Sequence, residues 1–313
     1  MSDIEYLIRN YYKNSNVFSQ ETSSHWKKYG AKQEIEFNLQ STSQGNAGAL
    51  GLMSIKGEGF GDFKKLSVLN LLASIPVFFY LALILWPKLR KSTLLKAINY
   101  SIKSKQIPGF DVTRMALTID YLTTVIGNLN DKSITIIGDG YGRLGSLLKL
   151  TFPSCKIIYI NLGRTLTFDY YYTYKVFPNL THKLVHKMSD FVDDFNYIEA
   201  EKYASLDLKS DIFINIASMQ EMDMKQIEGY FNLIRSQEKA IFYCCNRLSK
   251  SLPDNSVINF NDYPWAGFEI LTDELCPWHQ KFPSIKPPFV RSFDGPIQHR
   301  VVRFGNFELL SNL

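Results

Sequence analysis

A short β-branched run that stops at three alternating glycines constrains this chain more than any other feature. The run from Ser133 to Ile137 carries no charge and is rich in isoleucine, as is typical of a strand buried on both faces of a parallel sheet. Leucines at helical spacing follow from Leu144, which predicts a helix directly after the glycines. Glycine permits positive φ and lets backbone N–H groups approach a ligand. We therefore expect an α/β sheet that presents this loop to a nucleotide-like ligand, and the loop residues are Gly138, Asp139, Gly140, Tyr141 and Gly142.

The chain from residue 131 onward alternates strand-like and helical segments. This rhythm predicts a doubly wound, Rossmann-like parallel sheet with right-handed crossovers. The expected strands are 133–137, 156–161, 195–199, 211–216 and 240–244. The expected helices begin near 142, 165 and 223. The ranges 267–271 and 299–304 are expected to close the sheet as an antiparallel pair.

Residues 1–130 are predicted to form a mostly helical N-terminal cap over the substrate, and residues 131–313 to form the sheet domain. Helical periodicity marks 4–12 and 94–104, and 111–129 has the pattern of an amphipathic helix that leads into the sheet. The stretch 40–61 is rich in Gly, Ser and Asn, so we expect a long loop there.

The composition is that of a globular protein of the cytoplasm. The 313 residues are 45% apolar, and the formal charge of +5 is compatible with an anionic small molecule or a membrane surface. No cluster of Lys and Arg resembles a nucleic-acid-binding tract, so no nucleic-acid partner is predicted. The first residues are too charged for a secretory leader. The chain is therefore expected to stay inside the cell.

The four cysteines are predicted to be buried free thiols. They form no C-x-x-C pair, and three of them lie in or beside apolar, strand-like runs, which favours reduced thiols over disulfides or zinc ligands. His182 and His186 lie four residues apart without a carboxylate at ligand spacing, so no metal site is predicted. The cysteines are Cys155, Cys244, Cys245 and Cys276.

The uncharged segment from Leu66 to Pro87 leaves three interpretations open. It is long enough to span a bilayer, and basic residues flank it on both sides. Pro76 interrupts it, which suits two short helices that are buried against the protein or at the subunit contact of an oligomer. A peripheral contact with a membrane surface lies between these interpretations.

Two nucleotide-like ligands fit the glycine loop. Residues 140–145 satisfy G-x-G-x-x-G, the pattern that places a dinucleotide pyrophosphate at the N-terminus of the next helix. Alternatively, the glycines at 138, 140 and 142 cradle the amino-acid part of S-adenosylmethionine. Asn161 ends the second strand and is placed to hydrogen-bond ribose hydroxyls of either ligand. An NAD(P)-dependent oxidoreductase therefore stays an alternative, although the sequence offers no evident acid–base pair for it.

Polar residues gather after the strand expected at 211–216, in the sequence Asn215…Ser218-Met219-Gln220-Glu221-Met222. Together with the loop 137–144, with Phe242-Tyr243…Asn246 and with Asp262-Tyr263-Pro264, this segment resembles the sugar O-methyltransferases, a bacterial branch of the class I S-adenosylmethionine-dependent fold. The resemblance extends from about residue 111 to the C-terminus. It implies a seven-stranded methyltransferase sheet and methyl transfer to a sugar hydroxyl of a nucleotide-linked or lipid-linked glycan, in surface polysaccharide biosynthesis.

The same resemblance implies that S-adenosylmethionine is bound by the glycine loop and by the ends of the second and fourth strands. The family pattern has an aspartate where this chain has Asn161, which predicts a weakened ribose contact. A catalytically degenerate, membrane-associated scaffold therefore stays a second alternative. The implied cofactor contacts are Gly138, Asp139, Gly140, Tyr141, Gly142, Asn161, Asn215, Ser218, Met219 and Gln220.

Methyl transfer to an unactivated hydroxyl is an in-line displacement, so a positioned base has to remove the hydroxyl proton. Glu221 is the first candidate base because it follows the fourth strand at the carboxyl edge of the sheet; its alternative role is to cap the next helix. His279, in a proline-rich connection, is the second candidate. Tyr263 and Trp265 follow the fifth strand, where this fold commonly builds its acceptor site, and are expected to contact the substrate.

Overall fold

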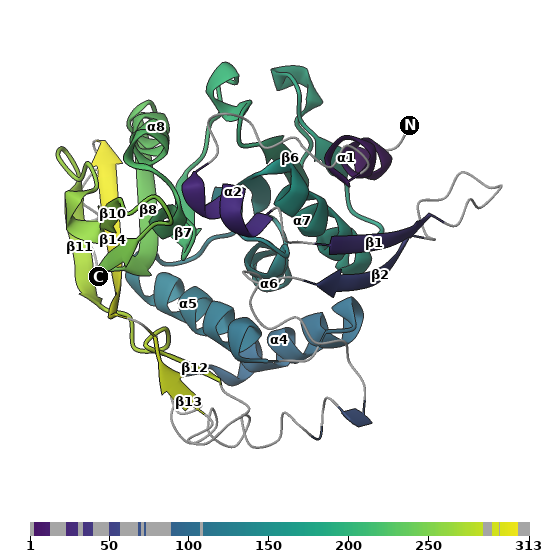
Figure 1. The fold of residues 1–313 in the computed structure, drawn as a ribbon. Coiled ribbons are helices and arrows are strands. Elements are labelled where there is room, and N and C mark those ends of the chain that lie inside the picture. Colours follow the sequence, from purple (N-terminus) through teal and green to yellow (C-terminus); the bar gives the residue numbers. More distant parts are fainter. Residues whose placement is uncertain are drawn as a thin grey trace.

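The computed structural model describes residues 3–12, 23–30, 34–39, 50–56, 68–69, 72, 89–106, 109–283, 290–293 and 295–305. An eight-stranded sheet forms its centre, and helices cover both faces (Figure 1). The strands of this sheet, in spatial order, are β11 (Glu269–Leu275), β14 (Ile297–Gly305), β8 (Lys239–Arg247), β7 (Ile212–Ile216), β3 (Ser133–Ile137), β4 (Lys156–Asn161), β6 (Phe195–Glu199) and β5 (His182–Leu184).

Seven helices and three strand pairs complete the described elements. The helices, apart from short 3₁₀ turns, are α1 (Asp3–Tyr12), α2 (Ser24–Gly30), α4 (Lys91–Ser104), α5 (Phe110–Ile126), α6 (Arg143–Thr151), α7 (Gly163–Val176) and α8 (Met224–Arg235). The paired strands outside the sheet are β1 (Glu34–Leu39) with β2 (Leu50–Lys56), β9 (Ser249–Ser251) with β10 (Val257–Asn259), and β12 (Lys281–Pro283) with β13 (Val290–Ser292).

The doubly wound order predicted from the sequence is confirmed. Neighbouring strands run parallel from β5 through β8, whereas β14 runs antiparallel to both β8 and β11. The five expected strands correspond to β3, β4, β6, β7 and β8, and the expected closing pair corresponds to β11 and β14. Three of the helices that cover the sheet, α6, α7 and α8, begin within two residues of their expected starts.

The sheet has eight strands instead of the seven expected. The additional strand, β5, has three residues and pairs with β6 at the edge of the sheet. A run this short carries no readable alternation of apolar and polar residues, because a strand pattern needs at least four residues. His182 fixes the strand through two hydrogen bonds of 2.9 Å, one between its Nδ1 and Tyr197 Oη and one from its Nε2 to Phe177 O.

The N-terminal region departs from the mostly helical expectation. The strands β1 and β2 pair in antiparallel fashion, and β2 lies inside the range 40–61 that was expected to be a loop. Of the segment 66–87, the structure describes only Val68, Leu69 and Leu72, and all three are exposed. No helix within the described residues is long and apolar enough to cross a membrane. The division of the chain near residue 130 stays a prediction.

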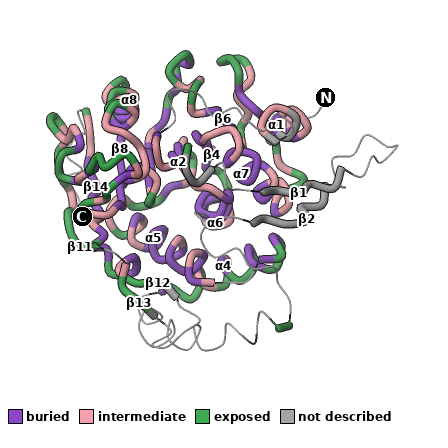
Figure 2. Tube along the Cα trace, in the orientation of Figure 1, coloured by how far each residue is buried: buried purple, intermediate pink, exposed green. Residues whose placement is uncertain are grey.

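Alternate residues of the central strands face two separate apolar cores, one on each side of the sheet. Figure 2 colours the buried residues purple, and helices that pack on the sheet, such as α5 and α6, carry purple stretches. Ile134 and Ile136 of β3 belong to the core that includes α4, α5, α6 and α7, whereas Ile137 belongs to the core that includes α8. Ile157 and Ile158 of β4 divide in the same way. Burial on both faces explains why these strands read as continuous apolar runs.

Close packing of α6 on β4 depends on Gly145. A Cβ atom at this position would lie 2.2 Å from Tyr159 Oη. Tyr159 is fully buried, and its hydroxyl lies 3.1 Å from Thr173 Oγ1, so the ring has no space into which to retreat. Glycine therefore sets the distance between this helix and the sheet, and with it the position of the loop at the start of α6.

We expect Gly145→Ala to lower the free energy of unfolding by about 1–3 kcal/mol, the usual cost of overpacking a core. Urea denaturation measures this change. Gly229→Ala in α8 is the matched control, because its Cβ would lie 2.5 Å from Tyr203 Oη but Tyr203 is only half-buried and can move. Equal losses in the two variants would contradict the role given to Tyr159.

Candidate functional site

A cavity of about 970 Å³ opens at the carboxyl ends of the central strands. The strand β3 lies between β4, which follows it in the chain, and β7, which comes later in the chain. The strand order therefore reverses direction at β3, and open α/β sheets bind ligands at such a switch point. Its volume is near the upper end of the roughly 300–1,000 Å³ range of small-molecule sites, which leaves room for two ligands. The predicted site residues that line it are Gly138, Asp139, Gly140, Tyr141, Asn161, Ser218, Gln220, Glu221 and His279.

The three glycines of the loop all have positive φ, but they face different surroundings. A Cβ atom at Gly138 would lie 2.3 Å from Ser218 Oγ, and one at Gly142 would lie 2.2 Å from Thr173 Oγ1. At Gly140 the nearest atom is the Thr165 methyl group at 3.9 Å. Packing therefore demands glycine at 138 and 142, whereas Gly140 is the position where a ligand can approach the backbone.

Asp139 closes the N-terminus of α6. Its carboxylate accepts hydrogen bonds from the backbone N–H groups of Arg143 at 3.0 Å, Leu144 at 3.3 Å and Gly145 at 3.0 Å. These are first-turn donors that a helix offers to an anion, and the carboxylate also complements the helix dipole. A pyrophosphate at this position would meet N–H groups that are already hydrogen-bonded, and the Asp139 carboxylate would repel it.

We expect Asp139→Ala to lower the free energy of unfolding by about 0.5–2 kcal/mol, as loss of a helix cap does. Asp139→Asn keeps one acceptor oxygen for the Arg143 and Leu144 N–H groups, so it should lose less. Thermal and chemical denaturation of both variants measure the difference. If the asparagine variant lost as much stability as the alanine variant, the capping account would be wrong.

A second carboxylate, that of the fully buried Asp169 of α7, supports the same loop. Its Oδ1 accepts a hydrogen bond from Gly142 N, and its Oδ2 accepts one from Asn161 Nδ2, both at 2.8 Å. Burial raises the pKa of Asp169 well above its usual range, and the neighbouring Asp139 carboxylate raises it further. An aspartate at 161 would bring a third carboxylate against this pair, so the neutral amide of Asn161 suits its neighbours.

Asn161 borders the cavity, but both ends of its side chain bind the protein. Besides the bond from Nδ2 to Asp169, its Oδ1 accepts a hydrogen bond from Leu162 N at 2.9 Å. The side chain is 8% exposed. A ribose contact by this residue stays a prediction.

Asn215 and Met219 lie behind the wall of the cavity. Asn215 is fully buried, and its Nδ2 donates to Ile137 O at 2.9 Å and to Ser218 Oγ. Its Oδ1 accepts hydrogen bonds from Met219 N at 3.2 Å and from Asn246 Nδ2 at 2.8 Å. These contacts position the turn 217–221, while neither residue lines the cavity.

Charged side chains from α5 and α6 line the cavity beside the glycine loop. Arg143 Nη1 donates to Asp111 Oδ2 at 3.1 Å, and Arg114 donates to the other oxygen of the same carboxylate. Both arginines are more than nine-tenths buried. The Arg143 guanidinium also lies 4.5 Å above the Tyr141 ring. Two guanidinium groups thus share one carboxylate in this wall of the cavity.

Glu221, in the 3₁₀ turn Met219–Glu221, lies at a second charged corner. Its Oε1 accepts a hydrogen bond from Lys250 Nζ at 2.8 Å, and its Oε2 lies 3.4 Å from His25 Nε2. Ser23 Oγ donates to the Glu221 backbone carbonyl, so the chain before α2 is tied to the same turn. Neither His25 nor Lys250 was predicted, because nothing in their local sequence marks them; only the fold brings them to Glu221.

Tyr263 and Trp265 do not line the cavity. Their rings pack with Phe231 and Phe260 in the core beside α8, and Trp265 Nε1 donates to Phe260 O at 2.8 Å. The expectation that they contact an acceptor is not supported by this position. Large rings after a strand fill the core as readily as they form a substrate platform.

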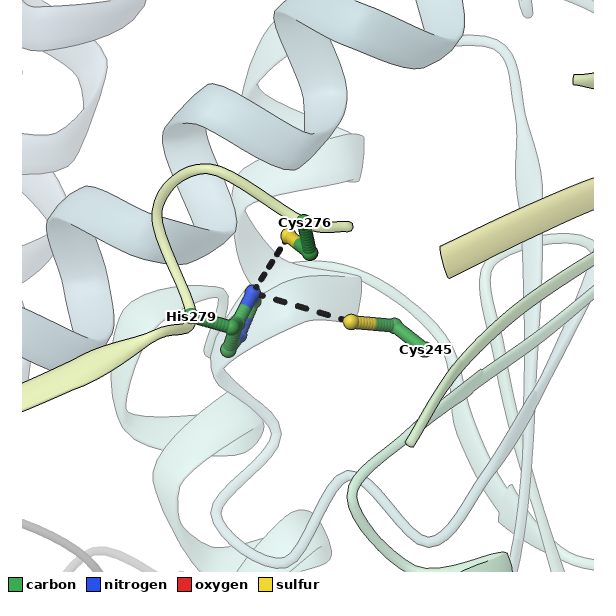
Figure 3. Close-up of side chains that lie close together, drawn as sticks. All are labelled: Cys245, Cys276 and His279. Atoms are coloured by element: carbon green, nitrogen blue, oxygen red, sulfur yellow. Dashed lines mark hydrogen bonds between the residues drawn. The ribbon is translucent and has the colours of Figure 1, made fainter. Parts of the chain in front are cut away.

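His279, in the turn that follows β11, lines the cavity, but it is only 3% exposed. Its Nδ1 faces two thiol groups, Cys276 Sγ at 3.1 Å and Cys245 Sγ at 3.7 Å (Figure 3). All four cysteines are buried and none forms a disulfide, as predicted.

Comparisons with known proteins find solved structures of similar fold, but no match by sequence. No protein-family model matches the chain, and no curated protein matches its sequence. Similar solved structures include a candidate RNA methyltransferase from Pyrococcus horikoshii, with 10% identity, a TM-score of 0.45, and 69% of this chain and 100% of that chain covered. They also include the cyclopropane synthase MmaA2 from Mycobacterium tuberculosis, with 8% identity, a TM-score of 0.42, and 59% and 82% covered.

Proposed function

We propose that this protein is an S-adenosylmethionine-dependent methyltransferase. The observation that carries the proposal is the Asp139 carboxylate at the start of α6. A dinucleotide-binding loop keeps the N-terminal donors of this helix for a pyrophosphate. Here these donors bind Asp139 instead, which favours a ligand that presents no phosphate to the loop.

The charges beside the loop suit the amino-acid part of S-adenosylmethionine. Asp111 and Arg114 line the cavity together with Gly138 and Gly140. An ion pair of this kind offers an acceptor for an ammonium group and a fork of donors for a carboxylate. These residues, with the open backbone at Gly140, would hold the cofactor, and the bound cofactor supplies the methyl group.

We further propose that the acceptor is a sugar hydroxyl on a nucleotide-linked or lipid-linked glycan, as in surface polysaccharide biosynthesis. The resemblance of the 215–222 and 242–246 segments to sugar O-methyltransferases supports a sugar. Arg247 supports an anionic group on the acceptor, because it lines the cavity and its buried Nε has no hydrogen-bond partner among the described residues. Both kinds of glycan carry phosphate. Contact of the segment 66–87 with a membrane stays a prediction.

The geometry around Glu221 suits proton removal from a hydroxyl. Glu221 lines the cavity with a side chain that is 17% exposed, so an acceptor can reach it. Lys250 and His25 hold its two oxygens in place, and an oriented base raises the fraction of productive encounters. We assign Glu221 as the base and Lys250 and His25 as positioning residues.

The cofactor assignment predicts saturable calorimetric binding of S-adenosylhomocysteine and no binding of NAD⁺ or NADP⁺. Gly140→Val should abolish the binding of S-adenosylhomocysteine, because a branched side chain would enter the open space above the loop and would strain a φ of +87°. Circular dichroism checks that the variant is folded. Binding of a dinucleotide by the native protein would overturn the assignment.

The base assignment predicts that Glu221→Gln spares cofactor affinity and lowers turnover by about 100- to 10,000-fold, the usual contribution of general-base catalysis. Radiolabelled methyl transfer to a sugar-nucleotide panel, alongside calorimetry, measures both quantities. Glu228→Gln, at an exposed position of α8, is the control and should change neither. Equal losses of affinity and turnover in Glu221→Gln would contradict its role as base.

A further inference from the structure

We propose that Cys245, Cys276 and His279 form a zinc-binding site in the wall of the cavity. Figure 3 shows the two sulfur atoms directed at the same imidazole nitrogen. One ligand atom from each residue lies within 4.8 Å of the other two, and all three residues are buried. Binding of the metal does not depend on the methyl-transfer reaction proposed above, so each proposal can fail without the other.

The distances match a tetrahedral site. Zinc–sulfur bonds of about 2.3 Å and zinc–nitrogen bonds of about 2.0–2.1 Å place sulfur and nitrogen ligands about 3.5 Å apart. The two sulfur-to-Nδ1 distances are 3.1 Å and 3.7 Å, on either side of this value. The two sulfur-to-nitrogen distances are therefore within a few tenths of an ångström of those in a tetrahedral zinc site.

Three segments of the backbone hold the ligands in place. Cys245 belongs to β8, whereas Cys276 and His279 flank the turn that follows β11. The turn is closed by a hydrogen bond of 3.2 Å from His279 N to Cys276 O, and Cys276 N donates to Ile297 O of β14 at 2.9 Å. Gln280 Nε2 donates to Cys276 O at 2.9 Å. The site is thus built before a metal enters, which lowers the entropy cost of binding.

The chemistry of the ligands selects the metal. Thiolate and imidazole ligands favour zinc over magnesium or calcium, which take oxygen ligands. Two thiolates balance the charge of one Zn²⁺ ion, so the loaded site is neutral and suits its buried position. Zinc binds cysteine as the thiolate, so each zinc ion releases the protons of the two thiols to solvent as two Zn–S bonds form.

Three protein ligands leave a fourth tetrahedral position, as in zinc sites that exchange a ligand. His279 is the one of the three ligands that also lines the cavity. A water molecule completes the coordination at the fourth position.

Cobalt substitution tests the site on the full-length protein. The metal-free, reduced protein is titrated with Co²⁺, and we expect one ion per chain, the near-ultraviolet charge-transfer band of cobalt–thiolate bonds, and about two protons released per ion in weakly buffered solution. Added Zn²⁺ should displace the cobalt and abolish the band. A native protein that binds no Co²⁺, or binds it without a thiolate band, overturns the proposal.

Variants locate the bound ion. Cys276→Ser and His279→Gln should each weaken Co²⁺ binding by more than the roughly 10- to 100-fold that loss of an outer-shell partner costs. Cys155→Ser is the matched control, because Cys155 is equally buried and lies outside the cluster, and it should leave the band unchanged. Circular dichroism confirms that each variant is folded. Native affinity in both cluster variants overturns the assignment, whatever the result of the methyltransferase assays.

Discussion

Two carboxylates, the half-buried Asp139 and the fully buried Asp169, hold the loop on which the cavity depends. Asp139 binds the first turn of α6, and Asp169 binds Gly142 and Asn161 from the opposite side. A buried carboxylate is costly unless hydrogen bonds satisfy it, so each fixes the backbone groups that it accepts from. Together they set the path of the glycine loop, and the loop sets the floor of the cavity.

This arrangement also explains an unusual residue at the end of β4. The sugar O-methyltransferases that the sequence resembles have an aspartate at the position of Asn161, and the resemblance implies a ribose contact there. In this chain Asp169 already supplies a carboxylate next to that position, and the amide of Asn161 donates to it. The acid and the amide form one hydrogen-bonded unit, and the consequence of Asn161 for cofactor binding stays a prediction.

Much of the fold followed from the sequence because its signals are local. Uncharged runs such as 133–137 and 156–161 predicted the central strands, and the glycines predicted the loop between β3 and α6. The three-residue strand β5 was not predicted because it is too short to show a pattern. The strand β2 was not predicted because its apolar residues lie among glycines and serines, which favour a loop.

The roles of individual side chains were harder to predict, because burial and partners are properties of the folded chain. Asn215 belongs to a recognised motif, but in the structure it is a buried residue whose hydrogen bonds position the turn 217–221. His25 and Lys250 belong to no motif, and yet both contact the Glu221 carboxylate. The two thiols beside His279 are far apart in sequence and meet only through the antiparallel pairing of β14 with β8 and β11.

The hydrogen bond between Ser23 and Glu221 joins residues 198 positions apart in the sequence. A contact across such a distance forms late, because the chain between its ends has to be ordered first. During synthesis, residues 23–25 leave the ribosome long before Glu221 and Lys250 exist. The glycine loop and its two carboxylates, all within 138–169, can assemble while the rest is still being made. We therefore expect the corner of the cavity around Glu221 to be completed only when the N-terminal segment docks onto a sheet that is already built.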